Sequence, residues 1–255
     1  MSSLSFRYCI RSDLPANPES PASIGAKFVH TLDALSGIDP KVFANWEVMD
    51  LPAIESLPLA AARSRIAEII KNNVSRDDCG EPDPDWGGYT ADAYTGHGLS
   101  PRCMSLRIVS GAKRAGETDL EAGEYDMFPD PAVVKYPVFK AALLAINAIW
   151  PPVWACAYAF RMNYDSVPLV PGAALFPYSR FHIPWLAYFS TPLAADVKLP
   201  PEIKTERTPD GGLLMIATEQ RLDPTDPEHL RRARILAQTM IARTGYRSAR
   251  NSAAT

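Results

Sequence analysis

The stretch Leu213-Leu214-Met215-Ile216-Ala217-Thr218, which follows the turn sequence Pro209-Asp210-Gly211-Gly212, decides the fold. Proline presets φ for the first turn position, and Asp-Gly-Gly tolerates the positive φ of a tight hairpin. We therefore expect a β-hairpin that pairs residues 203–208 with residues 213–218. Because the second strand is apolar on both faces, it should be covered on both sides and lie inside a sheet.

The segments on either side of this hairpin predict one more strand and the last helix. Residues 182–190 are rich in aromatic side chains and predict a strand. After the hairpin, Thr225 or Asp226 can accept a backbone N–H as the N-cap of a helix. Apolar residues recur at helical spacing from about residue 226 to residue 244, so this helix should bury one face.

The rest of the chain shows strand and helix patterns in turn. Alternating apolar and polar residues predict strands over 4–11, 42–49, 103–109 and 154–164. Helical spacing predicts helices over 21–37, 59–74 and 137–149. Residues 75–100 have no period and predict a long ordered loop, and a short edge strand is expected near 125–128.

These elements predict an α+β fold with a mixed, largely antiparallel sheet flanked by about four helices. We expect a single domain over residues 1–246 and a flexible tail over 247–255. The first twelve residues lack the apolar run of a signal peptide, and Cys9, Cys79, Cys103 and Cys156 have no paired spacing. We therefore expect a reduced cytoplasmic protein whose thiols are structural and that does not cross a membrane.

Charge is unevenly distributed, although the net charge of the 255 residues is only −3. Residues 77–92 hold six acidic and no basic side chains, and so do residues 117–130. Residues 231–250 hold six arginines and no acidic residue. Because arginine is favoured near helix C-termini, this basic segment is weak support for nucleic-acid binding, and we expect none.

No catalytic or metal-binding pattern is visible in the sequence. It contains no nucleophile elbow, zinc-protease motif, phosphate loop or dinucleotide fingerprint. His97 near Cys79 and Cys103 lacks the close ligand pairs of a zinc site, and the acids from residue 77 to residue 85 lack the spacing of a calcium loop. We expect no enzyme activity, metal or cofactor. The alternative is a small-molecule-binding or hydrolytic enzyme with a pocket near Tyr158, Tyr178 and Trp185.

Several motifs follow one another in an order that carries a family resemblance. The clearest are Pro184-Trp185-Leu186-Ala187-Tyr188, the strand that ends before Glu219, and Asp-Pro-Thr-Asp-Pro-Glu-His-Leu at residues 223–230. A looser match precedes them in the chain and consists of Trp46, Trp86-Gly87-Gly88 and a helix ending at Trp150. In this order the chain resembles the immunity protein 52 family of bacterial polymorphic toxin systems. The resemblance implies a cytoplasmic inhibitor that binds a toxin domain, typically one similar to the restriction-endonuclease-fold toxins delivered between bacteria, for example by type VI secretion.

If the partner is such a nuclease, acidic residues interleaved with aromatic ones become candidate contacts. A nuclease presents a basic groove, so carboxylates can steer the encounter while aromatic side chains serve as buried anchors. The competing interpretation is an ordinary solvated acidic loop. We expect the toxin to contact residues 77–94, with residues 117–130 as a second surface. The candidate residues are Asp77, Asp78, Glu81, Asp83, Asp85, Trp86, Tyr89, Tyr94, Glu121, Glu124 and Asp126.

Overall fold

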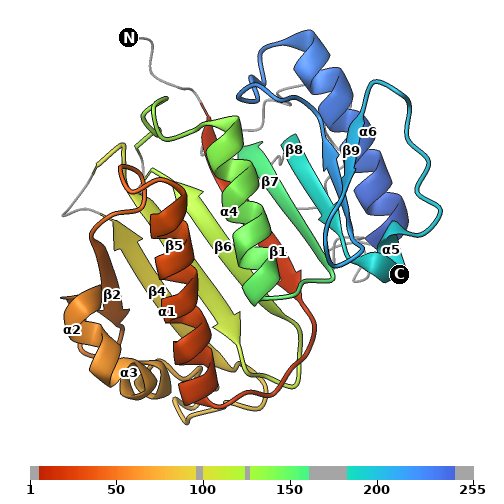
Figure 1. Ribbon diagram of the computed structural model, residues 1–255. Coiled ribbons are helices and arrows are strands. Elements are labelled where there is room, and N and C mark those ends of the chain that lie inside the picture. The colour runs from red at the N-terminus through yellow and green to blue at the C-terminus, as the bar shows by residue number, and fades with distance from the viewer. Residues whose placement is uncertain (1–5, 96–99, 124–126, 161–182, 245–255) are drawn as a thin grey trace.

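The computed structural model describes residues 6–95, 100–123, 127–160 and 183–244, which form one ten-stranded sheet (Figure 1). The strands are β1 (Arg7–Leu14), β2 (Trp46–Asp50), β3 (Glu55–Pro58), β4 (Tyr89–Thr95), β5 (Met104–Ser110), β6 (Gly116–Ala122), β7 (Trp154–Phe160), β8 (Ile183–Phe189), β9 (Lys204–Arg207) and β10 (Leu213–Ile216). Their order in the sheet is β3-β2-β4-β5-β6-β1-β7-β8-β10-β9, and every neighbouring pair is antiparallel. The predicted α+β class with a largely antiparallel sheet is confirmed.

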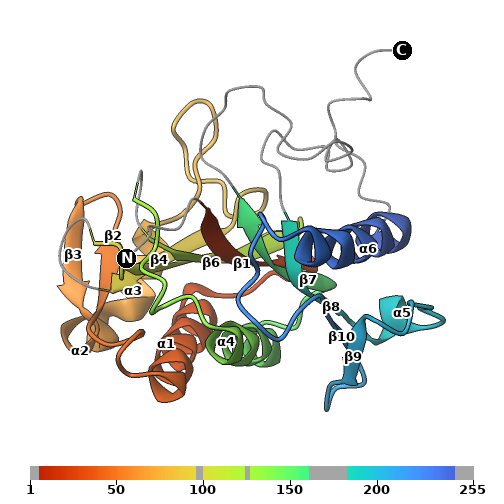
Figure 2. The ribbon, with the colours of Figure 1, turned by 90° about the horizontal axis from the view of Figure 1, so that it is seen from above.

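Helices lie on both faces of the sheet (Figure 2). They are α1 (Pro21–Ile38), α2 (Leu59–Ala62), a 3₁₀ turn (Arg63–Arg65), α3 (Ile66–Asn72), α4 (Tyr136–Ile149), α5 (Thr191–Ala194) and α6 (Pro227–Thr244). The helices α1, α3 and α4 cover one face and enclose the larger core with it. The opposite face is covered by α6 near β7, β8 and β10, where a second, smaller core forms.

The predicted hairpin is present, and its second strand is an interior strand, as expected. β10 pairs with β8 on one side and β9 on the other, and all of its residues are buried. Gly211 has φ +84°, which glycine adopts without strain. A Cβ on Gly212 would lie 2.5 Å from a ring carbon of Tyr188, so the second glycine lets the turn pack against β8.

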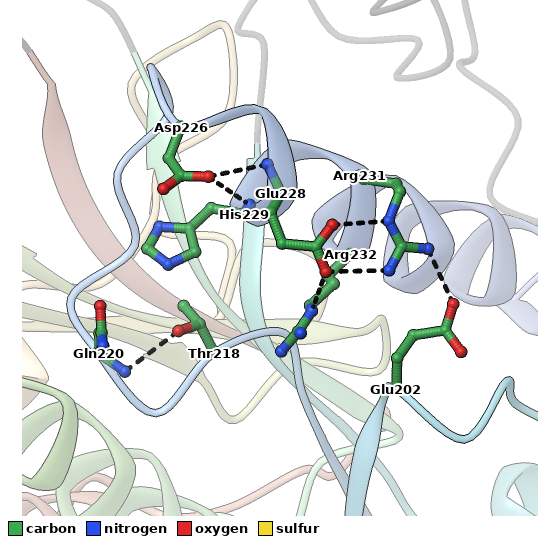
Figure 3. Close-up of polar contacts among 8 residues, drawn as sticks. All are labelled: Glu202, Thr218, Gln220, Asp226, Glu228, His229, Arg231 and Arg232. Carbon is green, nitrogen blue, oxygen red and sulfur yellow. Dashed lines mark hydrogen bonds and ion pairs between the residues drawn. The ribbon is translucent and has the colours of Figure 1, made fainter.

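Helix ends follow the capping rules that the sequence indicated. Ser20 caps α1 by accepting the Ser23 N–H at 3.2 Å. Of the two candidates for α6, Asp226 is the cap, since its carboxylate accepts the N–H groups of Glu228 at 2.8 Å and His229 at 3.2 Å (Figure 3). Carboxylates at a helix N-terminus are stabilised by its free N–H groups and dipole.

Several predicted elements have different bounds in the structure. The strand expected over 4–11 is β1, which runs from Arg7 to Leu14, and residues 4–5 lie outside the described residues. The strand expected from residue 42 begins at Trp46, because the N–H groups of Val42 and Phe43 bond to the Asp39 carbonyl in a turn after α1. The helix expected over 59–74 is divided into α2, the 3₁₀ turn and α3. It changes direction because α2 packs on β2 and β3, whereas α3 packs against α1.

The expectation of a loop over 75–100 is wrong from Tyr89, where β4 begins. This interior strand buries the small residues Ala91 and Ala93 rather than large ones, so its alternation was weak. β6 was also missed as an interior strand, because three of its seven residues are glutamate or aspartate, which are uncommon in strands. Of the edge strand expected near 125–128, residues 125–126 lie outside the described residues, and 127–128 form no strand. Residues 161–164, the end of the strand expected over 154–164, also lie outside them.

The four cysteines carry free thiols. Cys9, Cys103 and Cys156 are buried, in agreement with a structural role, whereas Cys79 is exposed. Among the described residues, no helix is both long and apolar enough to cross a lipid bilayer.

Candidate functional site

Residues 75–88, here called the acidic loop, connect α3 to β4 and are closed at their base by backbone hydrogen bonds. The Ser75 N–H donates to the Gly88 carbonyl at 2.9 Å, and the Asp83 N–H donates to the Ser75 carbonyl at 2.7 Å. Gly88 has φ +70°, and a Cβ there would collide with the Ser110 carbonyl oxygen. The Trp-Gly-Gly motif therefore fixes the loop closely against the β5–β6 turn.

Two of the predicted acids shape the loop itself. One carboxylate oxygen of Asp77 accepts the N–H groups of Cys79 and Glu81, both at 2.9 Å. The Asp83 carboxylate accepts the Trp86 N–H at 3.1 Å. Such aspartate turns are a common way to hold a loop in one conformation. Asp78 and Glu81 are exposed at the loop tip, so their carboxylates face solvent.

Two basic residues of the β5–β6 turn pack against the same loop. The Lys113 ammonium lies 2.5 Å from the Asp85 carboxylate, and the Arg114 guanidinium lies 5.7 Å from the centre of the Trp86 ring. Trp86 is nevertheless 67% exposed. Lys113 and Arg114, which lie about 28 residues further along the chain, place positive charge beside Asp85 and Trp86. The acidic loop is therefore less negative in the folded protein than its own residues indicate.

The two predicted tyrosines lie on β4 and point to opposite faces of the sheet. Tyr89 packs against the larger core beneath α1 and α3, so it is not part of the same exposed surface as Trp86. Tyr94 lies on the other face, where its hydroxyl donates to the Glu47 carboxylate at 3.0 Å. The expected grouping of Trp86, Tyr89 and Tyr94 on one loop is therefore wrong.

The face on which Tyr94 lies carries charged side chains across the strands that α6 leaves uncovered. We call it the polar sheet face and define it by Glu47, Asp92, Tyr94, Arg107, Glu117, Asp119, Glu121, Arg7, Arg11 and Asp13. These side chains alternate with core residues along β2, β4, β5, β6 and β1. With six carboxylates and three guanidinium groups, the face is negative overall.

Ion pairs cross this face from strand to strand. The register places Asp92, Arg107, Asp119 and Arg11 opposite one another in a single row. Arg107 donates two hydrogen bonds to Asp92, at 2.9 and 3.1 Å. Arg11 pairs with Glu117 and lies 3.6 Å from Asp119. Opposite charges on neighbouring strands stabilise the sheet, and here they also fix a patterned charged surface.

Burial raises the pKa values of Asp119 and Cys9, which lie in the middle of this face. Burial raises the pKa of Asp119 to about 6; Arg11 opposes this rise and Glu117 adds to it. Burial also raises the pKa of the Cys9 thiol, whose sulfur lies 3.7 Å from an Asp119 oxygen. Burial lowers the pKa of Arg11, but the negative charges of Asp119 and Glu117 raise it by more. The net result is a raised pKa, so this guanidinium remains charged.

Of the three candidate residues named for the second predicted surface, Glu121 is the one that lies within the described residues. It lies on the polar sheet face, 2.7 Å from the Arg7 guanidinium. Glu124 and Asp126 lie outside the described residues. Arg11 and Arg107 were not predicted as members of this face, and Asp119 was included only within the range 117–130. The acids at every second position of residues 116–122 were the signal that could have revealed it.

The alternative pocket is not formed by its described residues. Tyr158 belongs to the smaller core beneath α6, whereas Trp185 is buried in the larger core, where its indole N–H donates to the Thr218 carbonyl at 3.0 Å. The sheet separates the two side chains, and Tyr178 lies outside the described residues. Among the described residues, no group of three or more His, Cys, Asp or Glu side chains could hold a metal ion.

The arginines that begin α6 are held by local carboxylates (Figure 3). Arg231 pairs with both Glu228 and Glu202 at 2.8 Å, and Arg232 pairs with Glu228 at 2.7 Å. Arg231 thus links the first turns of α6 to the segment that enters β9, whereas Arg232 pairs with a carboxylate of the same helix. Arg247 and Arg250 lie outside the described residues.

The chain is thus an α+β protein built on a single broad antiparallel sheet, one face of which carries the charged side chains described above. The sequence model of the family described as Immunity protein 52 matches residues 12–249, so the chain belongs to the immunity protein 52 family. The resemblance seen in the sequence motifs is thereby confirmed, and it supports an immunity-type role.

The fold of this chain is similar to that of a solved structure. The Pseudomonas aeruginosa T6SS protein PA0821 has a similar fold, with a TM-score of 0.54 and 13% sequence identity over 95% of this chain and 76% of that one. At this identity the likeness concerns the fold alone. No curated protein sequence matches this chain.

Proposed function

We propose that this protein is an immunity protein that binds a cognate secreted antibacterial toxin and neutralises it by protein–protein contact. Membership of the immunity protein 52 family supports this proposal most strongly. The polar sheet face and the acidic loop are consistent with it, because they form an extended surface rather than a catalytic cluster. In this account the protein acts as an inhibitor and not as an enzyme.

The proposed partner is a nuclease of the restriction-endonuclease fold. A nuclease must present cations to the phosphates of its substrate. The exposed carboxylates of Asp78 and Glu81, together with the net negative polar sheet face, complement such a surface. Complementary charges accelerate encounter and fix the orientation of the two proteins.

The proposed contacts combine the acidic loop with the polar sheet face. Trp86 is the exposed aromatic residue of the loop, and Tyr94 and Glu121 belong to the sheet face. Large, partly exposed aromatic side chains often become the energetic centres of interfaces. Tyr89 has an indirect role in this arrangement, because it anchors the start of β4 in the core.

The test requires the toxin domain encoded beside this gene, since immunity genes normally accompany their toxin genes. Cells that express the toxin should die, and co-expression of this protein should restore growth. The purified protein should also form a complex with a catalytically inactive toxin and block DNA degradation by the active toxin. Growth arrest despite co-expression, together with no complex, would refute the proposed function.

A further inference from the structure

The turn between β2 and β3 exposes an apolar side chain on a strained backbone. Residues 51–54, here called the hairpin tip, are all exposed. Ile54 is 86% exposed and has φ +54°. A β-branched residue in this region is a genuine outlier, because its Cβ crowds the backbone, and glycine or asparagine is the ordinary choice there.

The hairpin does not depend on the isoleucine side chain for its own closure. The turn is closed by backbone atoms, since the Ile54 N–H donates to the Leu51 carbonyl at 3.2 Å. With 86% of its surface exposed, Ile54 gains little from burial within this chain. A strained residue that contributes little to the fold is a reason to look for a role in binding.

The hairpin tip and the acidic loop are joined at their bases by Asn73. Its side-chain amide donates to the Met49 carbonyl at 3.0 Å and accepts the Leu51 N–H at 2.9 Å. Its own carbonyl accepts the Thr90 N–H at 3.0 Å, at the start of β4. Figure 1 shows the arrowhead of β2 and the chain that follows α3 at the same, lower end of the sheet. The bases of the hairpin tip and of the acidic loop therefore lie at the same end of the sheet.

The charges around the hairpin tip favour a basic protein as its partner. Glu55 is exposed next to Ile54, and Asp77, Asp78 and Glu81 are exposed on the acidic loop. An anionic membrane surface attracts basic residues, so these carboxylates disfavour it. A second copy pairing along β3 is also disfavoured, because this four-residue edge strand ends at Pro58, which has no N–H to donate.

We propose that the hairpin tip is an apolar anchor that inserts Ile54 into a pocket of the toxin beside the contact made by the acidic loop. This inference rests on the proposed function. The surrounding carboxylates guide the basic toxin to this end of the sheet, and Ile54 then slows its dissociation by burying an aliphatic side chain in the toxin.

Replacement of Ile54 by glycine separates binding from folding. Ile54→Gly removes the side chain and relieves the strain at φ +54°, so the variant should unfold at the same temperature as the parent protein or higher. Its affinity for the catalytically inactive toxin domain should fall at least about tenfold, mainly through faster dissociation. Ile54→Asn, which also tolerates positive φ, should behave in the same way.

Asp196 offers a matched control. It is an exposed residue with φ +56°, and it lies between α5 and β9, towards the other edge of the sheet. Asp196→Gly should therefore leave toxin affinity unchanged. If the parent protein and Ile54→Gly bind the toxin equally well, the anchor is refuted while the proposed function stands. If the parent protein itself binds no toxin, both proposals fail.

Discussion

At the scale of single residues, buried positions of the sheet should tolerate charge least. Leu214 lies on the interior strand β10 and is completely buried in the larger core. Leu214→Asp should lower the free energy of unfolding by several kcal/mol, because an unpaired carboxylate would lose its hydration. Thr205, exposed on the neighbouring strand β9, is the control, and Thr205→Asp should be nearly neutral. Urea denaturation of both variants measures the difference, and equal midpoints would contradict the buried placement of Leu214.

Asp119 should make stability depend on pH. Burial raises its pKa in the folded protein to about 6, from an ordinary value near 3.8. The folded state therefore holds this proton more tightly, so the contribution of Asp119 to stability is complete below about pH 4 and is lost as pH rises through about 6. The loss should be on the order of 2 to 3 kcal/mol. Asparagine does not titrate, so the Asp119→Asn variant should not lose this contribution. Its free energy of unfolding should rise relative to that of the parent protein between pH 4 and pH 7. A constant difference in urea midpoint across this range would contradict the raised pKa.

At the scale of elements, the acidic loop depends on its glycines. Gly88→Ala would place a Cβ against the Ser110 carbonyl at φ +70°, so we expect a loss of roughly 2 kcal/mol or more. Gly37 in α1 is the matched control, because a Cβ there meets no atom within 4 Å. Gly37→Ala should preserve or slightly raise stability. Thermal unfolding of both variants measures these changes. A melting temperature of Gly88→Ala equal to that of the parent protein would mean that the loop tolerates a side chain at residue 88.

The exposed acids of the loop should act on the rate of toxin association. Asp78 and Glu81 lie at the tip, so the double variant Asp78→Asn, Glu81→Gln should fold normally. It should associate more slowly with the toxin at low salt and approach the parent at high salt. A second double variant, Glu68→Gln with Asp196→Asn, removes the same charge from other exposed positions and should associate like the parent. Equal effects of the two variants would mean that only net charge matters.

Trp86 should act on dissociation instead. It is the exposed aromatic residue of the loop, and Arg114 packs over its ring. Trp86→Ala should weaken toxin binding by about 2 kcal/mol or more, mainly through faster dissociation. Because the indole is largely exposed, the melting temperature should change little. Surface plasmon resonance provides both rate constants, and unchanged dissociation would remove Trp86 from the interface.

At the scale of the whole molecule, the sequence predicted those elements whose signals are local. The 203–218 hairpin and the three long helices α1, α4 and α6 follow from turn residues, caps and apolar spacing. β4 and β6 were missed because their core positions hold small residues such as Ala91 and Ala93, or their outward positions hold acids. Strand pairing, not local pattern, makes these segments strands.

The candidate surface was predictable only in part, for the same reason. The loop acids and Trp86 were identified from their composition. The basic partners Lys113 and Arg114 come from a distant turn, and the row that joins Asp92 to Arg11 exists only after the sheet has formed. Which face Tyr89 occupies is likewise decided by the register of β4 against β5. Long-range pairing therefore determines the surface, and a single sequence does not specify it.

The most direct test of the account is hydrogen–deuterium exchange of the protein with and without its inactive toxin domain. The toxin should slow exchange in the exposed amides of the acidic loop, residues 75–88, and in the hairpin tip, residues 51–54. Exchange in the segment 195–200, which precedes the opposite edge strand β9, should stay the same. Toxin-induced slowing that falls on α1 and α4, with the acidic loop unchanged, would contradict the central claim that this loop and the polar sheet face bind the toxin.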